Sequence, residues 1–261
     1  MPNKNNIPVY ISLTSIFDNQ DKLYQTLQSI IVQKHNINKI YLNLSEDIYL
    51  LDKGFKDKNI SNKILYNFLQ QNKSIIEIKW VENIGSYRKL LPLLKEKWNE
   101  NCFIITIDDD TIYDQMLIEN LLNDYEKYKC VICYRGFTPK LSSLVQFEYY
   151  KRDNLKNLNK YNFSTGKGGI LYKPEFFYKT KDLIFNDQIY LKECRTKDDI
   201  WFYLIRILND VNCFIDNKKY MKKDITGKGL YAIYNRTYKS NKNNITNTVS
   251  LRNTMKLLNM K

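Results

Sequence analysis

Three consecutive aspartates, Asp108, Asp109 and Asp110, follow directly after a short apolar run at residues 103–107. Such a run is typical of a strand that is buried on both faces. Three carboxylates at its end would repel one another and lose hydration unless a cation lies beside them. Mg²⁺ and Mn²⁺ prefer oxygen ligands and can join a protein carboxylate to a substrate phosphate. The triplet alone fits two interpretations, a divalent metal site and an acidic, solvated loop.

A second acidic pair, Asp198 and Asp199, precedes a segment whose apolar spacing predicts a helix. Acidic residues in a first turn complement the helix dipole. Asp198, like Thr196, could therefore have a purely structural role as the N-cap of this helix. Neighbouring carboxylates also raise each other's pKa, so one of the pair could be a general base. Both interpretations stay open.

Histidine and cysteine chemistry is largely excluded. His35 is the one histidine, which rules out a multi-histidine zinc site and leaves any histidine-based nucleophile triad to His35 alone. The five cysteines are an odd number and are expected to be free thiols. Cys130 and Cys133 imitate a redox motif, but they lie in an apolar run that predicts a buried strand.

Gly166, Gly168 and Gly169 lie within four residues, where glycine permits close backbone approach or positive φ. Their spacing differs from the Walker and dinucleotide-binding patterns, so a flexible turn before a strand is the simpler interpretation.

Strand and helix patterns alternate through residue 134. The expected strands lie at residues 8–13, 39–44, 75–81, 103–107 and 130–134, and the expected helices at 20–33, 64–69, 90–98 and 117–125, with Ser61 as a cap of the second helix. This alternation predicts a parallel sheet with helices on both faces. Because ligands bind at the carboxyl ends of such strands, we expect Thr14 and Ser15 to share one cleft with the aspartate triplet.

The bulk composition fits one domain of 261 residues in two functional halves, 1–135 and 136–261. The net charge of +13 favours an anionic partner, but the lysines are scattered and the acidic triplet would repel nucleic acid, so no nucleic acid is expected. No apolar run approaches the roughly 18 residues of a membrane span, and no signal-peptide core is present, so we expect a cytoplasmic protein.

The last quarter of the chain is basic. Lysines at residues 218–223 and 228 could cover a diphosphate, or could form a solvated surface. Leu251, Met255 and Leu258 have helical spacing beside basic residues. We expect this tail to pack on the domain, with contact to anionic lipid as the alternative.

Six blocks in order resemble the GT-A-fold glycosyltransferases, and in particular the family 2-like enzymes of bacterial surface polysaccharide assembly. The blocks are residues 9–15, 39–44, 82–92, 105–113, 165–172 and 198–202, of which the fourth matches the family's DXD motif. The resemblance implies a single α/β domain with a mostly parallel twisted sheet flanked by helices. It also implies metal-dependent transfer of a sugar from a nucleoside-diphosphate sugar, with a UDP-sugar favoured, to a glycan or lipid-linked saccharide. Capsule or lipooligosaccharide synthesis at the cytoplasmic face of the inner membrane would be the setting.

The resemblance implies a role for single residues as well. The donor would contact Thr14, Ser15, Lys89, Asp108 and Asp109. Mn²⁺ or Mg²⁺ would bind to Asp110 and Asp108, and Asp108 would also serve the ribose side of the donor.

The acceptor side would be formed by Gly168, Gly169 and Trp201, and Asp199 would be the base, with Asp198 as its neighbour. The chain has Asp198 where the family more often has glutamate, which leaves open which of the two carboxylates points at the acceptor. An inverting reaction is expected, because the resembled family inverts.

Two other kinds of function are considered as alternatives. A nucleotidyltransferase or sugar phosphotransferase would use the same acidic triplet and would release other products. A basic nucleic-acid-binding module would leave the triplet unexplained.

Overall fold

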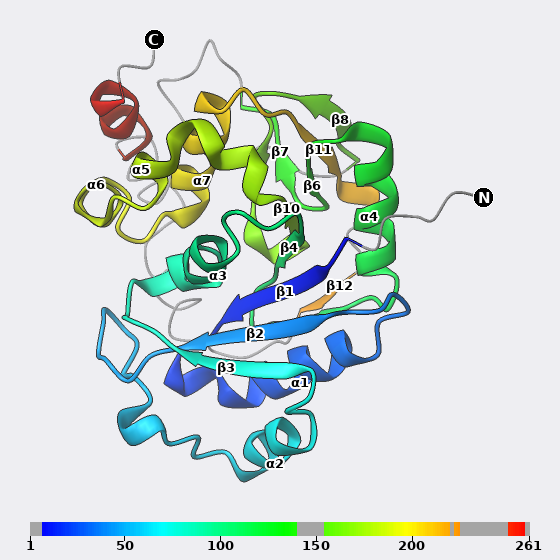
Figure 1. Ribbon diagram of the computed structural model, residues 1–261, viewed down its shortest axis with the longest axis vertical. Coiled ribbons are helices and arrows are strands. Elements are labelled where there is room, and N and C mark those ends of the chain that lie inside the picture. The colour runs from blue at the N-terminus through cyan, green and yellow to red at the C-terminus, as the bar shows by residue number, and fades with distance from the viewer. Residues whose placement is uncertain (1–6, 140–153, 220–221, 225–249, 259–261) are drawn as a thin grey trace.

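The computed structural model describes residues 7–139, 154–219, 222–224 and 250–258. Their main feature is an eight-stranded mixed sheet (Figure 1). Its strands, in spatial order, are β3 (Ile76–Trp80), β2 (Lys39–Leu44), β1 (Val9–Thr14), β4 (Phe103–Thr106), β10 (Ile170–Tyr172), β6 (Val131–Cys133), β11 (Cys213–Asp216) and β8 (Lys156–Asn159). The sheet therefore contains strands from both predicted halves of the chain.

The strand directions agree with the predicted parallel sheet except at β10 and β8. β1 is parallel to β2 and β4, β2 is parallel to β3, and β6 is parallel to β11. β10 lies between β4 and β6 and is antiparallel to both, and β8 is antiparallel to β11. A strand was expected after the glycines, but strand-helix alternation cannot reveal the direction of β10 or its place in the sheet, because an antiparallel strand needs no helical crossover. The predicted mostly parallel α/β sheet is confirmed, with β10 at its centre and β8 at its edge as the antiparallel exceptions.

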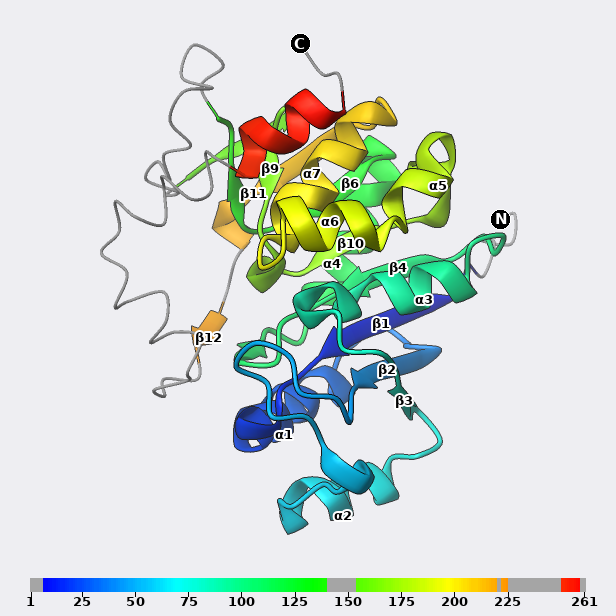
Figure 2. The ribbon, with the colours of Figure 1, turned by 90° about the vertical axis from the view of Figure 1, so that its left-hand side faces the viewer.

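Helices cover both sides of the central strands. In Figure 1, α4 lies on one side and α3, α5, α6 and α7 on the other, and Figure 2 shows α3, α6 and α7 on the face turned to the viewer. The labelled α-helices are α1 (Gln20–Ile31), α2 (Lys63–Gln71), α3 (Leu91–Glu96), α4 (Leu117–Tyr128), α5 (Lys181–Ile184), α6 (Asp187–Glu193) and α7 (Asp198–Leu208), and residues 250–257 are helical as well. Shorter 3₁₀ helices are η1 (Phe17–Asn19), η2 (Lys56–Lys58), η3 (Gly85–Lys89), η5 (Gly166–Gly168), η6 (Pro174–Thr180) and η7 (Asn217–Lys219). Two small strand pairs are β12 (Lys222–Asp224) with β5 (Thr111–Tyr113), and β7 (Gly136–Phe137) with β9 (Phe163–Ser164).

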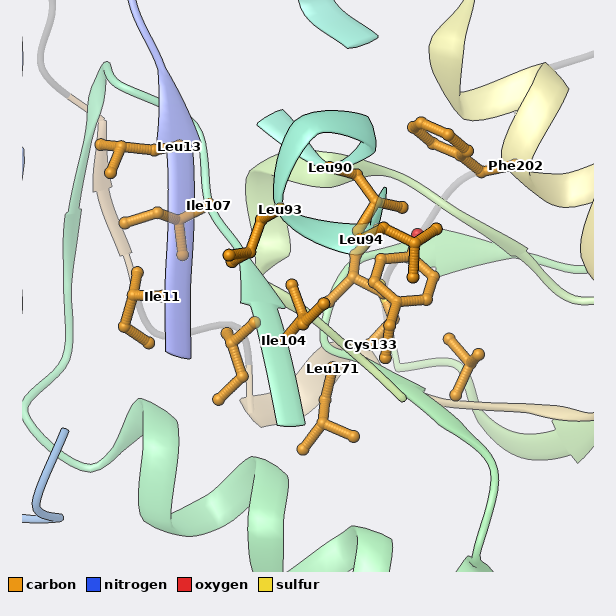
Figure 3. Packing of buried hydrophobic residues seen from close by; sticks show 14 of the residues in the cluster. Ile11, Leu13, Leu90, Leu93, Leu94, Ile104, Ile107, Cys133, Leu171 and Phe202 are labelled. Carbon is orange, nitrogen blue, oxygen red and sulfur yellow. The ribbon is translucent and has the colours of Figure 1, made fainter. Parts of the chain in front are cut away.

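One apolar core joins the sheet to α3 and α7. Figure 3 shows side chains of β1, β4, β6 and β10 packed with the start of α3 and with Phe202 of α7. Burial of this apolar surface is the main stabilising contribution to the fold. The core therefore holds the strand ends, from which the site is built, in fixed positions.

Helix starts differ from the prediction in two places. Ser61 does not cap α2: the Asn62 side chain accepts the Leu65 N–H at 2.9 Å, and the Ser61 hydroxyl accepts a hydrogen bond from Gln20 instead. Neither Thr196 nor Asp198 caps α7, because Lys197 occupies that position without a side-chain cap bond. Asp198 is thus in the first turn and is available for other contacts.

The five cysteines are free and buried, as expected. Burial raises the pKa of the Cys130 thiol to about 12, so this thiol is protonated at neutral pH. The tail also packs on the domain: Leu251 is buried, and the Thr254 hydroxyl lies 3.1 Å from the Cys194 sulfur. Within the described ranges, no helix is both long and apolar enough to cross a bilayer.

Candidate active site

A pocket of about 360 Å³ opens at the carboxyl ends of β1 and β4. Thr14 and Ser15 line it from β1, and the aspartate triplet lines it from β4. The shared cleft expected from topology is therefore present. η3 contributes Lys89, and the segment before β10 contributes Lys167.

Each aspartate of the triplet has its own partner. Lys89 Nζ lies 3.0 Å from Asp108 Oδ1, and Lys167 Nζ lies 3.4 Å from Asp110 Oδ1. Asp109 accepts hydrogen bonds from the Ser15 hydroxyl and, at 3.1 Å, from the Asn19 amide. Mutual repulsion within the triplet is thus offset by two ammonium groups and by polar hydrogen bonds.

The pKa values of these carboxyls diverge. Burial raises the pKa of Asp109 to about 6, although the hydrogen bond from Ser15 acts in the opposite direction. Burial would also raise the pKa of Asp108, but the ammonium of Lys89 outweighs it and holds that pKa below its usual value. Asp108 is therefore ionised at neutral pH.

Lys89 connects the triplet to the second acidic pair. Its ammonium lies between Asp108 and Asp198, 3.2 Å from Asp198 Oδ2. Burial alone would lower the pKa of Lys89, but Asp108, Asp198 and Asp199 outweigh it and raise that pKa well above its usual value. A permanently charged lysine therefore joins the two acidic motifs that the sequence places 90 residues apart.

Asp198 and Asp199 have different surroundings. The Ser86 hydroxyl donates to Asp198 Oδ1 at 2.6 Å, and Asp198 Oδ2 faces Lys89, although it has no aligned hydrogen bond among the described residues. Asp199 Oδ1 accepts the Gly166 N–H at 3.2 Å. Burial, with the charge of Asp198 next, raises the pKa of Asp199 to about 7. A carboxyl group with a pKa near 7 can take up a proton at neutral pH.

Of the three glycines, Gly166 is the one that lies against pocket-lining side chains. A Cβ on Gly166 would lie 2.8 Å from Lys89 Nζ and 2.9 Å from Asp108 Oδ1. Gly168 instead packs against the backbone of Arg135, and Gly169 adopts φ +75° beside Leu117. Neither Gly168 nor Gly169 lines the pocket of the triplet, so their expected place on the acceptor side stays a prediction.

Trp201 does not reach the cleft. Its side chain has no exposed surface, and its indole N–H donates to the Ile184 carbonyl at 3.2 Å. The expectation that Trp201 contacts the acceptor is therefore wrong. Helical spacing gives an apolar face, but it does not say whether that face meets a cleft or the core.

One buried ion pair at the pocket was not anticipated. Arg88 Nη2 lies 2.7 Å from Asp52 Oδ2, and both residues line the pocket. Asp52 also accepts hydrogen bonds from the backbone of Phe17 and Gly54. Arg88 Nη1 is buried and has no hydrogen-bond partner in the part of the chain that the structure describes. Asp52 lies in the loop after the predicted strand at residues 39–44. This position is the one feature of the sequence that could have indicated Asp52 as a pocket residue.

The donor set fits a divalent cation that also binds phosphate. Asp108 and Asp110 offer carboxylate oxygens at the pocket, and their side chains are 28% and 32% exposed. The described residues contain no group of three or more His, Cys, Asp or Glu side chains arranged to hold a metal ion. A metal here would therefore need further ligands from a diphosphate and water, which is the usual arrangement for Mg²⁺.

Sequence comparisons with protein families and with curated proteins give no match. Solved structures do match. S. aureus TarS residues 1–349 superimposes with a TM-score of 0.55 and 13% identity, over 83% of this chain and 60% of that chain. The same fragment in complex with UDP-GlcNAc gives a TM-score of 0.54 and 11% identity, over 85% of this chain and 60% of that chain. S. aureus TarS itself gives 0.56 and 12% identity, over 84% of this chain and 37% of that chain.

The chain thus spans less than two thirds of the length of these matched structures. At such low identity the likeness shows the fold alone. The described residues have a GT-A glycosyltransferase-like fold, as the sequence resemblance implied.

Proposed function

We propose that this chain is a metal-dependent glycosyltransferase that moves a sugar from a nucleoside-diphosphate sugar to a hydroxyl group of a glycan or lipid-linked saccharide. One observation carries the proposal: Lys89 joins the aspartate triplet of the pocket to Asp198 and its neighbour Asp199. This arrangement supports a diphosphate site in the pocket with a proton acceptor near it. S. aureus TarS, which shares the fold, has been solved with UDP and with UDP-GlcNAc, and this supports a UDP-sugar as the donor.

The charge of the pocket supports metal dependence. Among its described lining residues, Asp52 and the triplet give four carboxylates, against the three cations Arg88, Lys89 and Lys167. Asp52 and Arg88 neutralise each other, which leaves three carboxylates facing two ammonium groups. A bare diphosphate would be repelled, whereas Mn²⁺ or Mg²⁺ on Asp110 and Asp108 reverses the sign. The metal would neutralise the charge that develops on the leaving diphosphate.

The nucleoside would occupy the β1 end of the pocket. Thr14, Ser15 and Asn19 supply polar groups there, and Arg88 Nη1 is a buried donor without a described partner. An unpaired buried donor is costly, so an oxygen acceptor on the base or ribose would stabilise this end.

The acceptor hydroxyl would lose its proton to Asp199. Ser86 and Lys89 hold Asp198, whereas the raised pKa of Asp199 suits a group that takes up a proton. Direct displacement with one base inverts the anomeric centre, and we propose inversion. Capsule or lipooligosaccharide synthesis at the cytoplasmic face of the inner membrane is the setting that we propose from the sequence resemblance.

A donor screen tests the proposal. Purified protein is melted with a panel of nucleotide sugars, each with and without MnCl₂, because a bound donor raises the melting temperature by mass action. We expect one donor class to stabilise the protein in a metal-dependent manner. Incubation of that donor with saccharide acceptors should then release a nucleoside diphosphate.

The products separate the proposal from its alternatives. Release of pyrophosphate would indicate a nucleotidyltransferase and would contradict glycosyl transfer. A product that retains the donor's anomeric configuration, seen by NMR, would contradict inversion alone.

A further inference from the structure

A tight hairpin turn lies in the connection between β2 and α2. The backbone groups of Tyr49 and Asp52 exchange two hydrogen bonds, at 3.0 and 2.9 Å, so Leu50 and Leu51 form a two-residue tip. Leu50 adopts φ +55°. Where the first residue of such a tip has positive φ, glycine is the usual residue, because a bulky side chain is strained there. The chain therefore has a leucine where the turn favours glycine.

The side chains at this tip lie outside the apolar core. Leu50 and Leu51 are 40% and 36% exposed, and the nearby Ile48 is 79% exposed. Three large apolar side chains thus lie within four residues, without the core packing that would offset the strain of the turn. A sequence that breaks a local rule without a gain inside the chain points to a contact outside it.

The base of the turn is held firmly beside the pocket. Asp52 pairs with Arg88, and both line the pocket. The Tyr49 ring lies 3.3 Å from the position of a Cβ on Gly85, another pocket residue, and the Arg195 guanidinium lies 5.4 Å from the centre of that ring. In Figure 1 the chain leaves β2 at the end to which the arrows of β1 and β2 point. The tip therefore has a fixed place at the edge of the sheet where the pocket lies.

A lipid bilayer fits this tip better than a second protein does. Three side chains on a two-residue turn cover far less than the roughly 1,200 Å² of a stable protein interface. A bilayer needs no matching surface, and it takes up apolar side chains in proportion to their area. Within residues 46–58, outside the buried pair of Asp52 with Arg88, three lysines are matched by three acidic residues. The net charge of +13 on the whole chain therefore supplies the long-range attraction, and it favours an anionic membrane surface.

We propose that Ile48, Leu50 and Leu51 form a docking tip that inserts into the interfacial layer of an anionic lipid bilayer. Docking there sets the neighbouring pocket at the membrane surface. The inference rests on the proposed function in one respect, since a lipid-linked saccharide acceptor would lie at that surface. The driving force is independent of it, because insertion removes three apolar side chains from water and the basic chain is attracted to anionic headgroups.

The test measures binding of the full chain to sucrose-loaded vesicles by sedimentation, without nucleotide or acceptor. One set of vesicles is phosphatidylcholine alone, and the other is phosphatidylcholine mixed with phosphatidylglycerol. Ile48→Ser removes the most exposed side chain of the tip. Val32→Ser is the matched control, because Val32 is 64% exposed and follows α1, at the edge of the sheet opposite to the pocket.

Leu50→Gly separates docking from folding. Glycine adopts positive φ without strain, so this variant should keep or raise the melting temperature while it loses an apolar side chain of the tip.

The wild type should bind the mixed vesicles more tightly than phosphatidylcholine alone. Ile48→Ser and Leu50→Gly should each weaken that binding about tenfold, because each leaves less apolar area to bury. Val32→Ser should bind as the wild type does. Added salt should weaken the binding, because it screens the attraction to the headgroups.

Three results would overturn the inference. The first is vesicle binding that is absent in the wild type or equal in the wild type and both tip variants. The second is a fall in the melting temperature of Leu50→Gly, which would show that the leucine serves the fold. The third is a wild-type dimer that Ile48→Ser dissociates, which would identify a second copy of the chain as the partner. If vesicle binding follows the expectation but no nucleotide sugar stabilises the protein with MnCl₂, the proposed function fails and the docking tip stands.

Discussion

The two ends of the cleft hold their charges in different ways. At the β1 end, Arg88 and Asp52 lie 2.7 Å apart, with 1% and 2% of their side chains exposed. At the other end, Lys167 and Asp110 lie 3.4 Å apart and are 24% and 32% exposed. A buried pair cannot lose one partner without leaving an uncompensated charge, whereas a partly exposed pair can exchange. The first pair is therefore shielded from water, whereas the second pair lies partly in solvent at the pocket.

The largest effect on turnover is expected at Asp199. Asp199→Asn removes the proposed base without changing its size, so turnover should fall by about 10²–10⁴-fold. Metal-dependent stabilisation by the donor should remain, as measured by thermal melting. Normal turnover in this variant would show that Asp199 is not the base.

The buried end should dominate stability. Arg88→Met leaves Asp52 buried without its cation, and the free energy of unfolding should fall by about 3–5 kcal/mol. The same exchange at Lys167 should change stability far less, because that pair is partly hydrated. Urea denaturation of the two variants measures both. Equal losses would remove the distinction between the two ends.

Metal binding should depend on the open end. Asp110→Ala should weaken nucleoside diphosphate binding about tenfold in the presence of Mn²⁺, since loss of about 1.4 kcal/mol corresponds to that factor. Binding without metal should change little. Titration calorimetry with and without MnCl₂ checks this, and a metal-independent loss would argue against Asp110 as a ligand.

The pH profile follows from Asp199. The base must be ionised, and burial raises its pKa to about 7, so turnover should rise with pH up to about 7 and then level off. Ionisation of Asp199 should also destabilise the folded protein as the pH rises. Its folded pKa exceeds the unfolded value of about 3.9, so the native state binds more protons, and the free energy of unfolding falls as pH rises from about 4 to 7. Asp199→Asn should flatten that part of the stability curve.

The smallest effect is expected at Gly166. Gly166→Ala places a methyl group against Lys89 Nζ and Asp108 Oδ1, which are side-chain atoms that can shift. Donor affinity should fall about threefold, with little change in melting temperature. Gly168→Ala is the matched control, because its methyl group would meet the Arg135 backbone nitrogen at 2.5 Å and should lower stability instead.

Local sequence patterns predicted the strands and helices that carry the site, together with the site residues at the strand ends. The strands and helices through residue 134 have strong periodicity, and parallel strands bring Thr14 and Ser15 to the same edge as Asp108. The rest of the site depends on partners far apart in the chain. The pair of Arg88 with Asp52 spans 36 residues, and that of Lys167 with Asp110 spans 57. No spacing rule indicates such pairs, and none shows that Trp201 faces the core.

The reversed direction of β10 gives the cleft two kinds of loop. β1 and β4 leave the sheet at this edge, whereas β10 enters it there, so the Gly166–Gly168 segment arrives with main-chain N–H groups, one of which reaches Asp199. The loops proposed to bind the donor and the segment that contacts Asp199 thus belong to strands of opposite polarity. A substitution in the entering segment would therefore act on the proposed donor site and on Asp199 together, because Gly166 lies against Lys89 and Asp108 and donates its N–H to Asp199.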